Sequence, residues 1–139
     1  KTFNFSELAA RKAGTKDQGP GTGKGERLTV TYHDACHLKR GCGVHEAPRR
    51  VLRELVGVEI IEMADCDKCC GFGGSYSIKY PEISQEVLKN KMENIVATGA
   101  RTVAVDCPGC KLQIEGGLEA AGTGITVEHS ATLLARRLK

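Results

Sequence analysis

The chain has 139 residues, of which 40% are apolar and 4% aromatic, and its formal net charge is +3. No transmembrane segment is expected, because no apolar run approaches the roughly 20 residues that a spanning helix needs, and no secretory signal is visible. Nucleic acid is not an expected partner either, because the basic residues form short scattered pairs without stacking aromatics between them.

Seven cysteines are the unusual feature of the composition. Their odd number and clustered spacing argue against the disulfide framework of a secreted protein. Reduced thiols in a cytosolic chain more often bind metal or take part in redox chemistry, which predicts a cytoplasmic protein. The sequence opens on Lys1 rather than on methionine, so we expect it to be a piece of a longer protein.

The N-terminal part of the sequence differs from the rest. Residues 3–13 favour a short helix with Ser6 as its N-cap. Residues 14–25 are rich in glycine, which is typical of a flexible linker. We therefore expect residues 1–25 to be a helix and linker, and residues 26–139 to form one cysteine-rich domain.

Strand and helix patterns then alternate along the chain. Short β-branched or apolar runs predict four strands, over residues 28–32, 58–63, 102–105 and 125–128. Apolar residues at helical spacing predict four helices, over 46–56 up to Gly57, from Pro81 up to Gly99, over 109–121, and from Ser130 as a cap onward. This order predicts an α/β fold with a mostly parallel four-stranded sheet and helices on both faces.

The cysteines follow the ends of three predicted strands. Right-handed crossovers bring the carboxyl ends of parallel strands to one edge of the sheet. Cysteines stand after the first, second and third strands, at Cys36, at Cys66, Cys69 and Cys70, and at Cys107 and Cys110. Open α/β sheets bind ligands at this edge, so the sequence predicts a cysteine site there.

The adjacent pair Cys69 and Cys70 is the strongest local signal. A disulfide between neighbours is strained, and side chains of neighbours diverge in a strand, so such a pair rarely helps a fold. The run Gly-Phe-Gly-Gly follows it at residues 71–74, and so many glycines imply sharp bending or a close approach of the backbone. Two thiolates that bind one inorganic group would explain both the adjacent cysteines and the glycines that follow them.

Five cysteines form the candidate ligand set: Cys36, Cys69, Cys70, Cys107 and Cys110. Soft sulfur ligands select zinc, copper(I) or iron–sulfur clusters. Four ligands saturate a structural zinc site, so five convergent thiolates favour a cluster of several irons. A thioredoxin-like dithiol at Cys107-Pro-Gly-Cys110 is an alternative, but it leaves the vicinal pair without a role.

Other polar residues near the predicted site are weaker candidates. Cys42 and Cys66 are additional candidate ligands, although each could be a bystander thiol. His129 follows the fourth strand, where it could hydrogen-bond to the site or cap a helix. Asp34 and Asp106 have turn or capping roles as their default. The remaining histidines are weak signals individually: His33, His37 and His45.

The spacing of these motifs resembles a known family. Cys36 and Cys69 are separated by 32 residues, Cys70 is followed by Gly71, and 36 residues separate Cys70 from Cys107-Pro-Gly-Cys110. This pattern resembles the cysteine-rich CCG domain of heterodisulfide reductase, glycolate oxidase and lactate-utilisation iron–sulfur subunits. The likeness covers roughly residues 28–139, and residues 32–37 and 69–84 look most like the lactate/glycolate branch.

The resemblance implies a cofactor and its ligands. In the heterodisulfide reductase relative, five cysteines of this pattern hold a non-cubane 4Fe–4S cluster. Cys36, Cys69, Cys70, Cys107 and Cys110 correspond to them, whereas some relatives carry zinc or an ordinary cubane cluster instead. The domain often occurs twice in these subunits, and the resemblance implies that this chain is the C-terminal copy.

The resemblance also implies a function within an oxidoreductase complex. The expected function is electron transfer from a flavin-dependent lactate or glycolate dehydrogenase subunit, with a ferredoxin-like iron–sulfur module as a further partner. Two alternatives stay open: a cluster that cleaves a disulfide, as in heterodisulfide reductase, or a structural zinc that serves subunit assembly. The expected location is the cytoplasm, with membrane association through partners.

Overall fold

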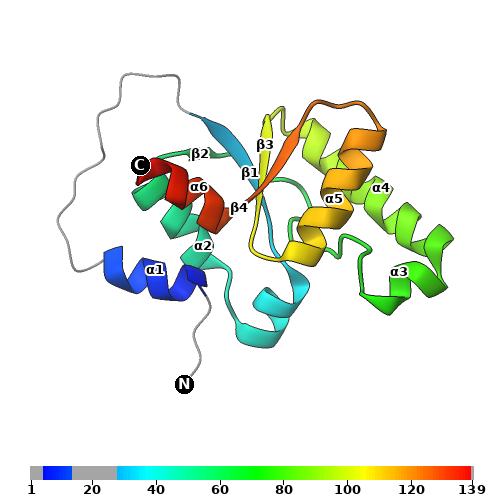
Figure 1. The fold of residues 1–139 in the computed structure, drawn as a ribbon, viewed down its shortest axis with the longest axis horizontal. Coiled ribbons are helices and arrows are strands. Elements are labelled where there is room, and N and C mark those ends of the chain that lie inside the picture. Colours follow the sequence, from blue (N-terminus) through cyan, green and yellow to red (C-terminus); the bar gives the residue numbers. More distant parts are fainter. Residues whose placement is uncertain (1–4, 14–27, 139) are drawn as a thin grey trace.

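A sheet of four short parallel strands lies at the centre of the computed structural model, which describes residues 5–13 and 28–138 (Figure 1). The predicted linker over residues 14–25 lies outside the described residues. In spatial order the strands are β2 (Glu59–Ile60), β1 (Thr29–His33), β3 (Thr102–Val105) and β4 (Thr126–His129). Every neighbouring pair is parallel, so the predicted α/β class and parallel sheet are confirmed.

Helical segments connect the strands and cover the sheet. In chain order they are α1 (Phe5–Ala13), the π-helical turn η1 (His37–Gly41), α2 (Glu46–Arg50), the π-helical η2 (Val51–Val56), α3 (Ser75–Lys79), α4 (Pro81–Ala97), α5 (Pro108–Ala120) and α6 (Ser130–Arg137). No helix among the described residues is long and apolar enough to cross a membrane.

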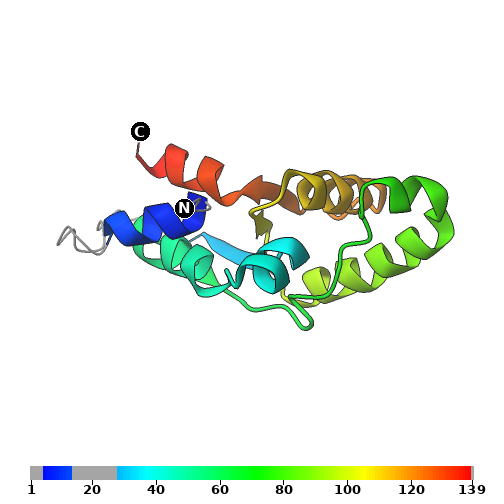
Figure 2. The ribbon, with the colours of Figure 1, turned by 90° about the horizontal axis from the view of Figure 1, so that it is seen from below.

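Two buried clusters show that helices pack on both faces of the sheet (Figures 1 and 2). Along β3, Val103 and Val105 belong to the cluster that α4 and α5 cover, whereas Ala104 belongs to the cluster that α1, α2, η2 and α6 cover. This alternation follows from the period of two in a strand. Strands buried on both faces need almost continuous apolar sequence, and all four residues of β3 are buried.

The strand order places a topological switch point between β1 and β3. From β1 the chain moves to β2 on one side, and it then returns to β3 and β4 on the other side. The connections that leave the carboxyl ends of β1 and β3 therefore diverge to opposite faces and leave a crevice between them, where doubly wound sheets bind ligands. The loops after β1 and β3 both carry cysteines, at Cys36 and at Cys107.

The second strand and the first long helix differ from the prediction. β2 has only two residues rather than the six expected over 58–63, because the chain leaves the sheet where Glu62 turns to accept hydrogen bonds from Arg49. The helix predicted over 46–56 is α2 continued by η2 up to Gly57. This last part has the wider i→i+5 turn of a π-helix, and its end residues Val51 and Val56 are both buried.

Two predicted caps are also wrong. Ser6 lies inside α1, is fully buried, and donates a hydrogen bond to Asp106, which follows β3. Ser130 is the first residue of α6, and the cap is His129, whose Nδ1 accepts from the backbone N–H of Ala131 at 3.1 Å. An imidazole acceptor satisfies one of the free N–H groups at a helix start as a serine hydroxyl would.

The packing of α5 gives a matched test of the fold. Leu118 on α5 has no exposed surface, whereas Leu112 on the same helix is 65% exposed. We expect Leu118→Ala to lower the free energy of unfolding by about 2–5 kcal/mol, because it leaves a cavity in the core. Leu112→Ala should change it by less than about 0.5 kcal/mol. Urea unfolding of the 139-residue chain measures both, and equal losses would contradict this packing.

Candidate metal centre

Five thiols from the three loops form one continuous chain of contacts at the carboxyl edge. Cys36 contacts Cys69, which is adjacent to Cys70; Cys70 contacts Cys110, which contacts Cys107. All seven cysteines of the protein lie in the described residues and all are free. The five candidate ligands predicted from the sequence therefore come together in space, although they lie up to 74 residues apart.

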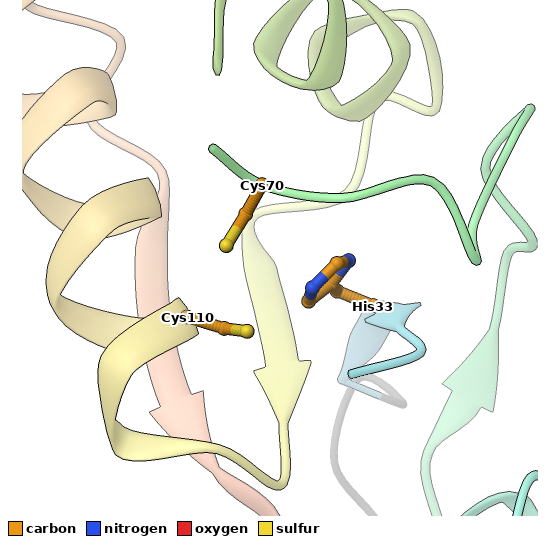
Figure 3. A group of neighbouring side chains, drawn as sticks. All are labelled: His33, Cys70 and Cys110. Carbon is orange, nitrogen blue, oxygen red and sulfur yellow. The ribbon is translucent and has the colours of Figure 1, made fainter. Parts of the chain in front are cut away.

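The most compact part of this group also contains a histidine. One nitrogen of His33 and the sulfur atoms of Cys70 and Cys110 all lie within 4.8 Å of one another. Figure 3 shows the three side chains turned toward one another from the end of β1, the cysteine loop and the first turn of α5. All three are buried, so a metal held here would be shielded from water.

His33 is the site residue that the sequence did not single out. Its ring is fully buried, and neither ring nitrogen has an oxygen or nitrogen hydrogen-bond partner within the described part of the chain; the polar group beside it is the sulfur of Cys70. Unpartnered buried nitrogens cost free energy unless something else satisfies them. The sequence signal that could have identified His33 is its position within the predicted strand, which decides the face of the sheet on which it lies. His33 ends β1 and faces away from its buried neighbour Tyr32, on the α4 and α5 face.

Cys70 and Cys110 form a buried, hydrogen-bonded pair of sulfur groups. The pKa of Cys70 is lowered by a hydrogen bond from Cys110 despite burial, with further help from His33 and the backbone N–H of Phe72. The pKa of Cys110 is raised by its hydrogen bond to Cys70 and by burial. Cys70 is thus the member of the pair that ionises more readily, and thiolate is the form that binds metal.

Cys69 lies at the outer side of the same loop and is exposed. Partial burial of its sulfur raises its pKa, and the neighbouring sulfurs of Cys70 and Cys36 add to this effect. The backbone N–H of Gly71 lies 3.3 Å from this sulfur and acts in the opposite direction, because it donates a hydrogen bond. The pair therefore presents one shielded and one accessible sulfur.

The start of α5 holds the two cysteines of the Cys-Pro-Gly-Cys motif. Cys107 is the N-cap, Pro108 is the first helical residue, and Cys110 lies in the first turn. Proline suits the first position because its missing N–H would have no partner there. The free N–H groups and the helix dipole at this end favour negative charge, which stabilises thiolates and anionic clusters.

Two glycines are needed because other groups approach their backbone closely. Gly71 has φ +89°, and a side chain there would overlap the carbonyl oxygen of Ser84 on α4. Gly109 lies under Phe72, whose ring atoms would be 2.7 Å from an added Cβ. Phe72 therefore packs directly on the first turn of α5. This contact holds the loop of Cys70 against the helix that bears Cys110.

A buried ion pair fixes the loop after β1. Arg49 donates to both oxygens of Asp34 at 2.9 and 3.0 Å and to both oxygens of Glu62 at 2.7 and 2.9 Å. The Arg49 guanidinium also lies 4.9 Å from the centre of the Tyr32 ring. Burial alone would raise the pKa of Asp34, but the hydrogen bonds and charge of Arg49 hold it below its ordinary value.

Asp34 joins this ion pair to the cysteine loop. Its backbone N–H donates to the carbonyl of Cys66 at 3.0 Å, and the thiol of Cys66 lies 3.3 Å from its carboxylate. Burial and this hydrogen bond raise the pKa of Cys66. Asp106 has a similar role after β3, where it accepts hydrogen bonds from Ser6 and Tyr32. Both aspartates thus connect separate elements, beyond the local turn roles predicted for them.

The weaker candidates lie outside the chain of five thiols. Cys66 is engaged with Asp34 and Arg49, and Cys42 is exposed at the end of η1. His129 uses Nδ1 to cap α6. The atoms gathered at the centre are therefore sulfur and imidazole nitrogen, a donor set that suits zinc, copper(I) or an iron–sulfur cluster.

A hollow of about 480 Å³ opens beside the centre. Cys69 lines it together with Asp65 and Lys68 of the cysteine loop and Asn90, Lys91 and Asn94 of α4. The accessible sulfur of the vicinal pair thus faces a space large enough for a small molecule.

The comparisons with known proteins agree with this geometry. Residues 30–115 match the family described as "CCG: Cysteine-rich domain". The chain belongs to this family. The match runs from β1 into α5, so it includes all three cysteine-bearing loops and confirms the family that the cysteine spacing predicted.

Curated relatives extend the likeness. The chain is 35% identical over 135 residues to lactate utilization protein A 1 of Bacillus mycoides, covering 96% of this chain and 53% of that protein. It is 36% identical over 135 residues to lactate utilization protein A of Shouchella clausii, covering 96% and 54%. It is 42% identical over 97 residues to a fumarate reductase (CoM/CoB) subunit of Methanothermobacter marburgensis, covering 70% and 20%. The chain spans about half the length of these lactate utilization relatives.

The buried ion pair gives a direct test of how the loops are held. Arg49→Met leaves the Asp34 carboxylate, whose side chain is 1% exposed, without its guanidinium partner. We expect the free energy of unfolding to fall by about 3–5 kcal/mol, because a buried charge loses its partner. Urea unfolding measures this loss.

Two further variants separate the charge effect from general damage. Arg50→Met removes an exposed arginine paired with Glu54 at 3.5 Å and should cost less than about 0.5 kcal/mol. The double variant Asp34→Asn with Arg49→Met removes both charges and should recover part of the loss. Equal losses for Arg49→Met and Arg50→Met would contradict the buried pair.

Proposed function

We propose that the cysteine-rich domain, residues 26–139, holds an iron–sulfur cluster and carries electrons in a 2-hydroxy-acid dehydrogenase complex. The observation that carries the proposal is the contact chain of five free thiols, supplied by three loops at one sheet edge. Five sulfurs exceed the four ligands of a structural zinc site and match the needs of a multi-iron centre.

The proposed ligands are Cys36, Cys69, Cys70, Cys107 and Cys110, and the proposed cofactor is a 4Fe–4S cluster, of non-cubane form by resemblance to heterodisulfide reductase. When bound, such a cluster supplies reversible one-electron transfer. The chain's own residues bind it, exclude water from the side of Cys70 and Cys110, and direct backbone N–H groups toward its negative charge.

The hydroxy-acid chemistry belongs to a partner. Oxidation of a 2-hydroxy acid to a 2-oxo acid releases two electrons and two protons, which a flavin in a dehydrogenase subunit can accept. The flavin then returns electrons singly to iron–sulfur centres, here this domain and a ferredoxin-like module. The printed names of the lactate utilization relatives support lactate as the substrate class. The complex would act in the cytoplasm, with any membrane contact made by its partners.

One observation favours a second candidate function. The hollow beside Cys69 could admit a small disulfide to the accessible side of the centre. Cleavage would take two electrons and two protons and release two thiols, with a low-potential electron donor as reductant. The relative named as a fumarate reductase (CoM/CoB) subunit supports a role in a reductase rather than in a dehydrogenase complex. Turnover of a mixed disulfide by the reduced, iron-loaded chain would establish this function in place of simple electron transfer.

Iron and acid-labile sulfide, counted per chain after anaerobic purification, test the proposal. We expect both in the wild-type protein, with an electron paramagnetic resonance signal after reduction. Cys70→Ser and Cys110→Ser should lose most of the iron, because each removes a central sulfur. Cys42→Ser, which removes an exposed thiol outside the contact chain, is the matched control and should keep it. One zinc per chain without sulfide would instead establish the structural zinc alternative.

A further inference from the structure

A lysine is buried in the face of α4 that packs on the sheet. Lys91 is 2% exposed and shares this face with Ser84 and the core residue Ile95. Lysine side chains usually keep their ammonium group in water, because the transfer of an unpaired charge into a protein interior is costly. Its position therefore calls for a compensating negative group nearby.

The direct partners of Lys91 supply little of that compensation. Its ammonium donates to the carbonyl oxygen of Asp65 at 2.6 Å and lies 4.0 Å from the sulfur of Met63. No carboxylate of the described residues lies within ion-pair distance of it, and the carboxylate of Asp65 pairs with Lys68 at 2.8 Å instead. The carboxylates of Asp65 and Asp67 act on Lys91 only from a distance, without an ion pair.

Lys91 lines the same hollow as Cys69 of the vicinal pair, so the lysine lies beside the proposed centre. Burial lowers the pKa of Lys91, and negative charge on Cys70 opposes that effect. Cys70 belongs to the compact group with His33 and Cys110 and is one of the proposed cluster ligands. The ammonium of Lys91 thus lies next to the cysteine loop, beside the hollow that Cys69 also lines.

α4 also fixes the position of this loop. Lys91 donates a hydrogen bond to the carbonyl of Asp65, which precedes the vicinal cysteines in the loop. Ser84, two helical turns earlier, donates to the carbonyl of Gly71 at 2.8 Å, just after them. The helix therefore forms hydrogen bonds to the loop on both sides of Cys69 and Cys70. One of the two donors, the ammonium of Lys91, carries a full positive charge.

We propose that Lys91 is a positioning residue whose fixed positive charge compensates the anionic cysteine-bound centre and raises its reduction potential. This inference rests on the proposed function. Each electron that enters the centre adds one negative charge, so a nearby cation stabilises the reduced form more than the oxidised form. The effect is large where water is excluded. A lysine that acted only as a hydrogen-bond donor to Asp65 would not need its charge.

The experiment compares charge with hydrogen bonding. Four proteins are purified anaerobically: the wild-type chain, Lys91→Gln, Lys91→Arg and the control Lys89→Gln. Lys89 is an exposed lysine on the same helix. Iron and sulfide per chain are measured first. Midpoint potentials then come from redox titrations followed by electron paramagnetic resonance. We expect Lys91→Gln to shift the midpoint to more negative potential, while Lys91→Arg and Lys89→Gln keep the wild-type value.

The outcomes separate the two proposals. A Lys91→Gln variant with wild-type iron content and wild-type potential would overturn the role of the lysine and leave the proposed function intact. Loss of iron from Lys91→Gln but not from Lys91→Arg would support the charge role. Equal loss from both, in variants whose circular dichroism shows a folded chain, would overturn it. Absence of iron and sulfide from the wild-type protein would overturn the proposed function itself, and this inference with it.

Discussion

The parallel pairing of β1 with β3 is the constraint on which the site depends. The register places His33 opposite Val105, so the two strands end together and their cysteine loops begin side by side. Side chains alternate between the faces of a sheet, and a slip of one residue would move His33 to the face that α1 and α6 cover. The apolar residues that lock this register therefore also set the distance between Cys36 and the cysteines of α5.

Polar groups buried around the loops complete this arrangement. Arg49 connects the loop after β1 to Glu62. Ser84 and Lys91 connect the cysteine loop to α4, and Phe72 packs on Gly109. Each contact joins a cysteine-bearing loop to a neighbouring element. Burial of so many polar groups is costly unless they are paired, so their concentration here indicates a site that is held in place before any ligand arrives.

Much of the fold can be predicted because local signals and burial agree. The apolar run over residues 102–105 predicts a strand, and β3 is observed there, since a buried central strand needs an unbroken apolar run. The convergence of the five cysteines follows from parallel topology alone. The prediction for β2 is too long, because apolar sequence continues after the strand leaves the sheet toward Met63, which belongs to the core on the other side.

The remaining features depend on long-range contacts that a single sequence does not reveal. The strand order, with β1 between β2 and β3, decides which loops face each other, and no local pattern encodes it. His33 looks like an ordinary strand residue until its neighbours Cys70 and Cys110 are known. Lys91 looks like a solvated lysine on a helix, because its burial depends on how the cysteine loop folds back over α4.

The central claim is that one multi-iron group joins the sulfurs of all three loops. X-ray absorption at the iron edge of the anaerobically purified chain tests it most directly. The account predicts iron surrounded by sulfur, together with a second shell of iron scattering at the short distance found within clusters. Absorption from zinc alone, or iron with oxygen ligands and no iron neighbour, would contradict it.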